Sequence, residues 1–309
     1  MDKFKSVLTR DEVAVFTLRA LYSEYGYERY KMSKFEEYDL YARNKDFLVS
    51  ENVITFTDTD GRLLALKPDV TLSIIKNSKD KPEGVIKTQY NENVYRISGG
   101  TKSFKEFMQV GLECIGNVGD AEISEVLLLA AKSLDSISER NILEISHLDI
   151  PESVLTYCGV SAAGKKNIFS YLAMKNKDGI KSVCEREGLA ADKSELAVSL
   201  VDIYGSPEAV IPELDKFRVN EKASEAVDRL SSLTATLTNA GYGKKICIDF
   251  SLVVDMKYYN GIAIKGFVEG IPSGILSGGQ YDNLMNKMGR KSRAIGFAVY
   301  LDELEKLSF

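Results

Sequence analysis

The chain has one histidine, four scattered cysteines and no apolar run long enough to cross a membrane. The cysteines form no Cys-x-x-Cys pair, which argues against a zinc or dithiol redox site; they are Cys114, Cys158, Cys184 and Cys247. The single histidine, His147, argues against a histidine-based catalytic triad or a metal site. We expect His147 to be a hydrogen-bonded residue at the end of a strand.

The chain also lacks an excess of basic residues. It has 309 residues, with 40 basic against 45 acidic side chains and a net charge of -5. Proteins that bind nucleic acid through its phosphates carry clustered lysine and arginine. The N-terminus, Met1-Asp2-Lys3-Phe4-Lys5, has no apolar signal core. We therefore expect a cytoplasmic protein whose principal partner is not nucleic acid. Hydrophobic residues make up 44% of the chain, which is enough for a large core.

The most informative stretch runs from residue 94 to residue 116. Apolar and aromatic residues lead to Arg96, a turn rich in glycine and lysine follows, and apolar residues then alternate with polar ones. The pattern predicts two antiparallel strands. On the second strand Gln109, Gly111 and Glu113 share a parity, which predicts a polar floor with open space at the glycine. Such a floor suits an amino-acid ligand; the alternative is a solvated sheet face with an incidental ion pair.

The rest of the chain predicts alternating helices and strands. Helices are expected over 9–25, 69–77 and 120–134, and extended chain or strands over 27–32, 35–41, 141–148, 246–253, 262–264 and 267–268. Residues 53–58 and 62–66 should form a hairpin, because Asp60-Gly61 supplies the positive φ of a tight turn. Asp69 is placed to cap the helix that follows it.

From Glu152 to about Ala240 the pattern changes to short helices separated by glycines, with no convincing strand. We expect a helical insertion over 151–240 in a core formed by 1–150 and 241–309. The run from Gly159 to Lys166 almost spells a phosphate-binding P-loop. We interpret it as coincidence, because Lys166 stands where a serine or threonine must reach magnesium and the preceding residues look helical.

Several motifs resemble those of class II aminoacyl-tRNA synthetases, in the version of the histidyl-tRNA synthetases. Tyr95-Arg96 opens the second motif, and Phe107-Met108-Gln109-Val110-Gly111-Leu112-Glu113-Cys114-Ile115-Gly116 closes it. Tyr258-Tyr259-Asn260 resembles the end of the histidine-specific loop, while 277–284 and 294–304 resemble Gly-Gly-Arg-Tyr-Asp and the third motif. The resemblance implies an α+β fold, an antiparallel sheet flanked by helices with a helical insertion. The family's first motif, part of its dimer interface, would fall near Ser33, where a proline is usual.

The resemblance also implies a histidine-binding pocket. In the family an acid and a threonine hold the amino group of histidine, and other polar residues grip its imidazole. The matching positions, with the arginine of the second motif, are Asp69, Thr71, Arg96, Gln109, Glu113, Tyr258 and Tyr259. The alternative is that these residues persist because they pack and cap. No catalytic residue, metal ligand or cofactor is expected.

Most cations that the family uses to activate ATP are replaced. The arginine of the histidine-specific loop is Val254, that of Gly-Gly-Arg is Gln280, and that of the third motif is Glu303. In the loop of the second motif, Lys102 and Lys105 are imperfect substitutes. Loss of one preorganised donor commonly costs roughly 10²- to 10³-fold in rate. The chain is therefore predicted not to adenylate an amino acid efficiently.

After the third motif the sequence has no stretch that resembles an anticodon-binding domain, so we expect the protein to lack one and to have lost most cations of the ATP site. This combination resembles the regulatory subunits of short-form ATP phosphoribosyltransferase, which are paralogues of the histidyl-tRNA synthetases and serve the first step of histidine biosynthesis. The resemblance implies a non-catalytic subunit that forms dimers within a hetero-octamer, is required by the catalytic subunit and confers feedback inhibition by histidine. The alternatives are a divergent ligase that activates histidine without charging tRNA, and a scaffold without a ligand. Histidine could bind in the inherited pocket or at a subunit junction.

Overall fold

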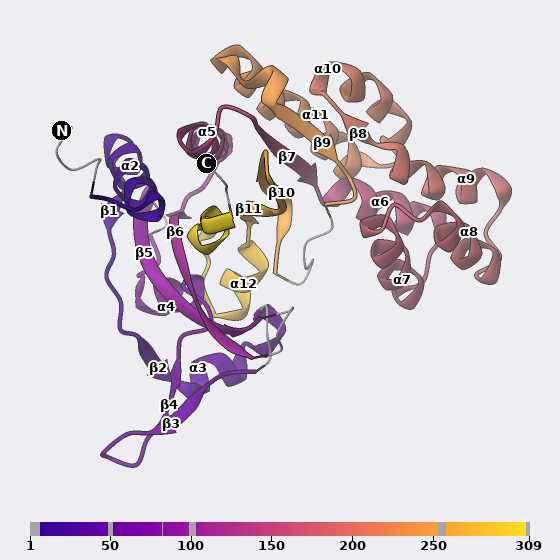
Figure 1. Ribbon diagram of the computed structural model, residues 1–309. Helices are drawn as coiled ribbons and strands as arrows, with labels where there is room; N and C mark the ends of the chain where they lie inside the picture. Colours follow the sequence, from indigo (N-terminus) through magenta and orange to yellow (C-terminus); the bar gives the residue numbers. More distant parts are fainter. Residues whose placement is uncertain (1–6, 49–51, 82, 99–102, 253–257, 307–309) are drawn as a thin grey trace.

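The computed structural model describes residues 7–48, 52–81, 83–98, 103–252 and 258–306. These residues form a large mixed sheet flanked by helices and a small separate sheet (Figure 1). The strand order of the large sheet is β1 (Glu28–Arg29), β5 (Val85–Ile97), β6 (Phe104–Gly116), β12 (Arg293–Tyr300), β11 (Ile271–Gln280), β10 (Asn260–Val268), β7 (Asn141–His147), β9 (Ile246–Asp249) and β8 (Tyr204–Gly205). Most pairs are antiparallel, but β1 pairs with β5 and β7 with β9 in parallel. The predicted α+β class is confirmed, with a sheet that is mostly antiparallel.

Strands β5 and β6 form the hairpin predicted around residues 94–116. They pair antiparallel over their full length, and the register places Tyr90 opposite Gly111 and Glu92 opposite Gln109. Because side chains alternate across a strand, Gln109 and Glu113 share one face of the sheet. This pair of strands is the scaffold on which the site is built.

Helices α2 (Arg10–Glu24) and α5 (Asp120–Ile137) pack together beside the large sheet. Leu18 and Tyr22 of α2 are fully buried, and the Tyr22 hydroxyl lies 3.0 Å from Oγ of Ser133 on α5. Thr9 and Glu12 cap the start of α2 reciprocally. This helix was predicted from the sequence, and two of its apolar residues, Val13 and Phe16, are 40% and 55% exposed.

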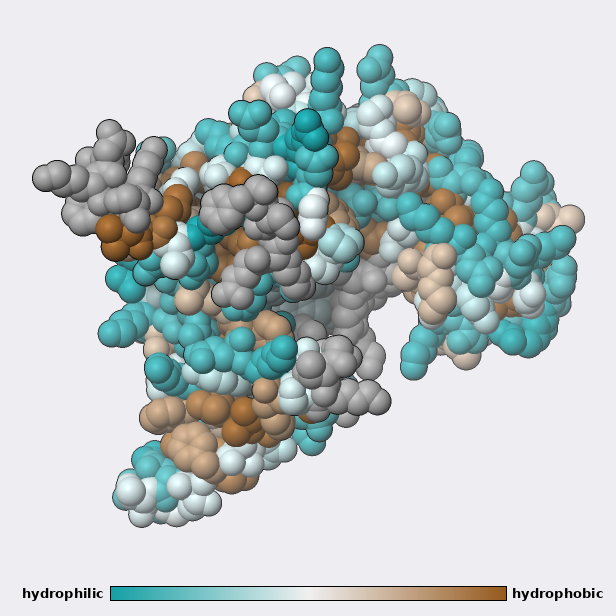
Figure 2. All heavy atoms as spheres, in the orientation of Figure 1, coloured by the Kyte–Doolittle hydropathy of each residue, from teal (hydrophilic) through white to brown (hydrophobic). Residues whose placement is uncertain are grey.

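The small sheet has the order β2 (Phe35–Glu37), β4 (Leu63–Leu66) and β3 (Thr55–Thr57). The predicted β3–β4 hairpin is confirmed, and Gly61 in its turn has a φ of +79°. Two exposed rings of the small sheet, Phe35 on β2 and Phe56 on β3, meet edge to face with centroids 5.5 Å apart. The part of the molecule that holds this sheet has hydrophobic surface in the lower part of Figure 2.

The extended segment predicted over 35–41 is confirmed only in part: residues 35–37 form β2, but residues 38–41 belong to helix α3 (Tyr38–Arg43). The aromatic composition of this segment favours strand. Tyr41, however, is completely buried and lies within 3.5 Å of the Ser73 hydroxyl on helix α4 (Thr71–Asn77). Burial of this side chain outweighs the local preference.

Helices dominate residues 149–237: α6 (Asp149–Cys158), α7 (Ala162–Ala173), α8 (Lys177–Arg186), α9 (Ala191–Ser199), α10 (Pro207–Val210) and α11 (Glu221–Leu237). Helices α6 to α9 project to one side of the sheet (Figure 1). The two-residue strand β8, which was not predicted, joins this region to β9. Gly159 ends α6 with a φ of +82°, so the P-loop-like run follows a helix and its interpretation as coincidence holds.

The helix predicted over 120–134 and the strand predicted over 141–148 are confirmed as α5 and β7. The strand predicted over 246–253 is shorter than expected, because β9 ends at Asp249. Helix α12 (Asp282–Lys287) packs with α4 in a second apolar cluster. Among the helices of the described residues, none has both the length and the apolar character that crossing a membrane would need.

Candidate functional site

A cavity of about 420 Å³ opens over strands β5, β6, β12 and β11 of the large sheet. The structure brings all seven residues predicted from the sequence to its wall: Asp69, Thr71, Arg96, Gln109, Glu113, Tyr258 and Tyr259. The other lining residues are Phe47, Leu48, Val70, Tyr90, Ser277, Tyr281, Gly296, Phe297, Ala298 and Tyr300. Side chains from α4, β5, β6, β10, β11 and β12 or the residues beside these elements therefore meet in one place.

The carboxyl group of Glu113 is more deeply buried than the other carboxyl group of the cavity, that of Asp69, and the residue is 2% exposed. The Thr71 hydroxyl donates a hydrogen bond to its Oε1 at 2.7 Å, and the Tyr281 hydroxyl donates one to its Oε2 at 2.6 Å. Burial raises the pKa of Glu113 to about 8, although both hydroxyl groups oppose this shift. Glu113 therefore exchanges a proton near neutral pH.

Two glycines allow this arrangement. A Cβ at Gly296 would lie 1.8 Å from Oε2 of Glu113, so only glycine leaves room for the carboxyl group. A Cβ at Gly111 would lie 2.4 Å from the Tyr90 hydroxyl oxygen. The space that the sequence predicted to be open at Gly111 is thus filled by the Tyr90 side chain, which was not predicted because it comes from the neighbouring strand.

Asp69 and Arg96 line another part of the cavity. The Leu72 amide donates a hydrogen bond to Oδ1 of Asp69 at 2.8 Å, so this carboxyl group caps α4 as well as facing the cavity. Burial raises the pKa of Asp69, and the charge of Arg96 opposes that shift. Nε of Arg96 donates to the Pro68 carbonyl oxygen at 2.6 Å, which holds the guanidinium near Asp69.

Three tyrosines form an aromatic wall. The ring centroids of Tyr258 and Tyr259 lie 4.6 Å apart, and those of Tyr258 and Tyr281 lie 6.0 Å apart. Burial raises the pKa of each of the three phenols, so all are neutral hydrogen-bonding groups. Sequence reasoning missed the role of Tyr281. Its only signal was its place in Gly279-Gln280-Tyr281-Asp282, within a recognised motif.

The family model of histidyl-tRNA synthetase matches residues 6–304. The chain belongs to the histidyl-tRNA synthetase family. Its relatives include the ATP phosphoribosyltransferase regulatory subunits of Ruminiclostridium cellulolyticum, 26% identical over 93% of this chain and 70% of the relative, and Acetivibrio thermocellus, 28% identical over 91% and 68%.

Solved structures share the fold of this histidyl-tRNA synthetase family member. The ATP phosphoribosyltransferase regulatory subunit/histidyl-tRNA synthetase from Bacillus halodurans C has a TM-score of 0.85 at 24% identity, covering 97% of this chain and 79% of that one. The ATP phosphoribosyl transferase (HisG:HisZ) complex from Thermotoga maritima has a TM-score of 0.74 at 19% identity, covering 94% and 97%. At these identities the likeness establishes the fold.

The residues at the positions expected to bind ATP add no positive charge to the cavity wall, as far as the structure describes them. Of the described residues that line the cavity, Arg96 is the only basic one. Gln280 is buried and its Oε1 accepts a hydrogen bond from the Ile262 amide at 3.0 Å, while Glu303 accepts one from the Ser273 hydroxyl. Lys105 is exposed and does not line the cavity. Val254 and Lys102 lie outside the described residues.

His147 departs from expectation. It ends β7 and is 2% exposed, but neither ring nitrogen has a hydrogen-bond partner in the part of the chain that the structure describes. The prediction of a hydrogen-bonded histidine is wrong. Burial lowers the pKa of His147 to about 4, so the ring is neutral, and the backbone of this strand end pairs with Ile262 of β10. Among the described residues no cluster of three or more metal-ligating side chains occurs.

Proposed function

We propose that this protein is a non-catalytic regulatory subunit of ATP phosphoribosyltransferase. It would be required for the activity of the short-form catalytic subunit in the first step of histidine biosynthesis, and it would make that activity sensitive to histidine. The names of its curated relatives support this proposal, since regulatory subunits of this enzyme align with more than nine-tenths of the chain.

The observation that carries the proposal is the asymmetry of the cavity. Its amino-acid side has a buried carboxyl group with two hydroxyl donors, a second carboxyl group and an aromatic wall. Its only basic lining residue among those described is Arg96. Attack on ATP brings two anionic groups together and needs several cations to offset the developing charge. A site that can hold an amino acid but lacks those cations suits a sensor better than an enzyme.

Histidine fits the chemistry of the wall. Its ammonium group would lie against Asp69 and Thr71, and its imidazole would meet Glu113 and the tyrosine hydroxyl groups, which together can satisfy both ring nitrogens. Arg96 and Gln109 supply donors for the ligand's carboxylate. Histidine would then stabilise the inhibited state of the complex, because a ligand shifts an equilibrium only by binding one state better.

The partner in this proposal is the short-form catalytic subunit, with two copies of this chain forming dimers within a hetero-octamer in the cytoplasm. Transfer RNA and membranes are not partners. The scaffold alternative differs only in lacking the effector, so a measurement of histidine affinity on the purified chain separates the two.

Reconstitution tests the proposal. The catalytic subunit is assayed for phosphoribosyl transfer to ATP alone, with this chain, and with this chain while L-histidine is titrated. We expect little activity alone, strong activation by the chain, and inhibition by histidine only in the complex. Equal activity with and without the chain would refute the regulatory role, while activation that histidine leaves unchanged would favour the scaffold.

A further inference from the structure

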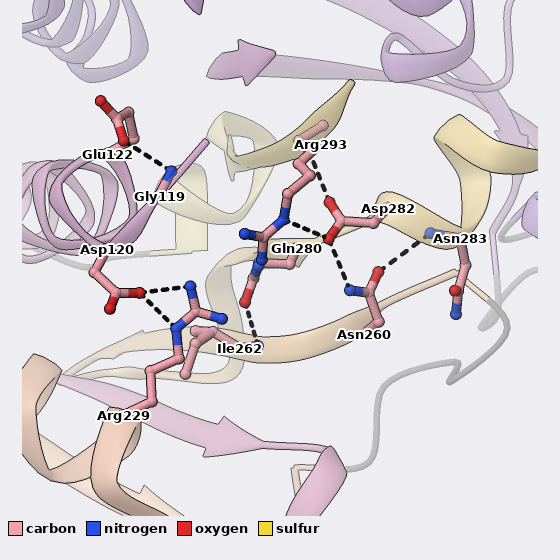
Figure 3. Close-up of polar contacts among 11 residues, drawn as sticks. Gly119, Asp120, Glu122, Arg229, Asn260, Ile262, Gln280, Asp282, Asn283 and Arg293 are labelled. Carbon is pink, nitrogen blue, oxygen red and sulfur yellow. Dashed lines mark hydrogen bonds and ion pairs between the residues drawn. The ribbon is translucent and has the colours of Figure 1, made fainter. Parts of the chain in front are cut away.

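Three segments that carry cavity residues meet at one carboxyl group that does not line the cavity. Figure 3 shows Asp282, the first residue of α12, between Asn260 and Arg293. Its Oδ2 accepts hydrogen bonds from Nδ2 of Asn260 and Nε of Arg293, both at 3.2 Å, and its Oδ1 accepts one from the Ala294 amide at 2.9 Å. The Asp282 side chain is 18% exposed, so its carboxyl group is largely shielded from water.

Each bond holds a segment of the cavity wall. Asn260 follows Tyr258 and Tyr259 directly, and its Oδ1 accepts a hydrogen bond from the Asn283 amide at 3.2 Å, as Figure 3 shows. Ala294 lies two residues before Gly296 on β12, and its carbonyl oxygen accepts the Tyr281 amide at 3.0 Å. Asp282 itself follows Tyr281. One carboxyl group thus connects the three tyrosines to the glycine that leaves room for Glu113.

The backbone ladder between two of these strands is interrupted at this junction. The pairing of β10 with β11 shifts register between Asn260 and Ala263, so the regular ladder is interrupted where the Tyr258–Tyr259 segment enters the sheet. Side chains replace the missing ladder bonds: Gln280 accepts the Ile262 amide, and Asp282 binds Asn260. The position of the aromatic wall therefore depends on side-chain hydrogen bonds.

We propose that Asp282 is a positioning residue that sets the affinity of the cavity for its amino-acid ligand through Asn260 and Ala294, without touching the ligand. The proposal rests on the proposed function, which makes histidine that ligand. Hydrogen bonds to a charged acceptor are stronger than neutral ones, so the negative charge of Asp282 is needed as well as its shape.

The substitution Asp282→Asn separates the parts of this role. The remaining carbonyl oxygen can still accept the Ala294 amide, but the new amide nitrogen faces two donors, Nδ2 of Asn260 and Nε of Arg293. We expect histidine to bind about tenfold more weakly.

Combining Asp282→Asn with Asn260→Asp reverses donor and acceptor. The amide introduced at position 282 can donate to the carboxylate introduced at position 260, which still accepts the Asn283 amide. The double variant should recover histidine affinity to within about threefold of the wild type.

Asp120→Asn is the matched control. Asp120 also accepts from an arginine, at 2.6 Å from Nε of Arg229, and Figure 3 shows this pair in the same view, but neither residue lines the cavity. This substitution also replaces a carboxylate by an amide, and it should leave histidine affinity unchanged.

The measurements are calorimetric titration of the purified full chain with L-histidine, thermal melting, and amide hydrogen exchange over residues 258–264 without ligand. Weaker binding and faster exchange in Asp282→Asn, both reversed in the double variant, support the role. A folded Asp282→Asn protein with wild-type affinity and exchange overturns it, as does a double variant that recovers neither.

If the wild-type protein binds no histidine, the part of the proposed function that makes this cavity a histidine site is refuted. The exchange measurement then decides the positioning role: faster exchange that the double variant reverses supports it, and unchanged exchange overturns it.

Discussion

Glu113 has the properties of a proton partner for an imidazole. Its pKa is raised to about 8 by burial, while a free imidazole has a pKa of about 6.5. Between these values the empty site carries a proton on Glu113 and free histidine has a neutral ring. The complex can then form with one proton shared between carboxyl group and ring, and no net proton is taken up or released.

Histidine affinity should therefore be greatest between about pH 6.5 and about pH 8. Below that window ring and carboxyl group are both protonated when free, so binding releases a proton and weakens as pH falls. Above it both are deprotonated, so binding takes up a proton and weakens as pH rises, by up to about tenfold per pH unit. Calorimetric titrations in buffers of different ionisation enthalpy measure both affinity and proton count. An affinity that does not change with pH contradicts this account of Glu113.

Glu113→Gln keeps the shape of the side chain and removes its charge. A charge-assisted hydrogen bond contributes about 1.5–3 kcal/mol, so histidine sensitivity of the reconstituted complex should fall by about one to two orders of magnitude. Activation of the catalytic subunit should persist, because it depends on docking surfaces. Glu144→Gln, at a half-buried carboxyl group on β7 outside the cavity, is the control. Unchanged inhibition in an assembled Glu113→Gln complex would mean that histidine acts elsewhere, most simply at a subunit junction.

His147 makes the fold sensitive to acid. Its pKa is about 4 in the folded chain because of burial and about 6.5 when unfolded. The unfolded chain therefore binds more protons between these values, and stability is lost as pH falls through that range. When the pH is lowered from about 7 to about 5, the free energy of unfolding should decrease in both proteins. The decrease should be about 2 kcal/mol smaller in the His147→Leu variant than in the wild type. Urea denaturation at both pH values measures this difference, and equal losses would contradict it.

At the scale of elements, periodicity predicted the β5–β6 hairpin and the face that carries Gln109 and Glu113. Consecutive side chains of a strand point to opposite faces, so the local sequence alone shows which residues share a face. Parity does not reveal what covers that face. Tyr281 donates to Glu113 from 168 positions later in the chain, and Tyr90 fills the space at Gly111 from the neighbouring strand. The exposure of Phe16 and the helix containing Tyr41 likewise depend on tertiary contacts that local patterns do not contain.

The contact between β12 and β6 also gives a prediction. A Cβ at Gly296 would lie 1.8 Å from Oε2 of Glu113 and 2.5 Å from the Leu112 carbonyl oxygen. Gly296→Ala should destabilise the chain by about 1–3 kcal/mol and displace the carboxyl group, which reduces histidine binding more than Glu113→Gln does. Gly119→Ala, whose Cβ would meet only Oε2 of Glu122 at 3.4 Å, is the control for thermal melting and calorimetry. Wild-type binding by a folded Gly296→Ala protein would show that the carboxyl group can move aside.

At the scale of the whole molecule, the chain has the fold of a synthetase family, but the described residues of its cavity lack most of the cations that amino-acid activation needs. The family model of histidyl-tRNA synthetase matches residues 6–304, and resemblance in the motifs predicted the fold because the strands that carry them also form the sheet. Function does not follow from fold, since it lies in a few side chains placed on the sheet. Under the proposed function, those side chains hold an amino acid and do not activate it.

The chain alone should not catalyse histidine-dependent exchange of pyrophosphate into ATP. Arg96 is the one basic residue among the described residues of the cavity wall; Gln280 is occupied by the Ile262 amide, and Glu303 is bonded to Ser273 and would repel a triphosphate. Each missing donor costs roughly 10²- to 10³-fold in rate, so loss of two or more leaves exchange below detection. The assay is run beside a charging-competent histidyl-tRNA synthetase, and tRNA charging by this chain should be absent too. Exchange at a rate typical of synthetases would favour the ligase alternative. It would also mean that a cation from elsewhere in the chain completes the ATP site.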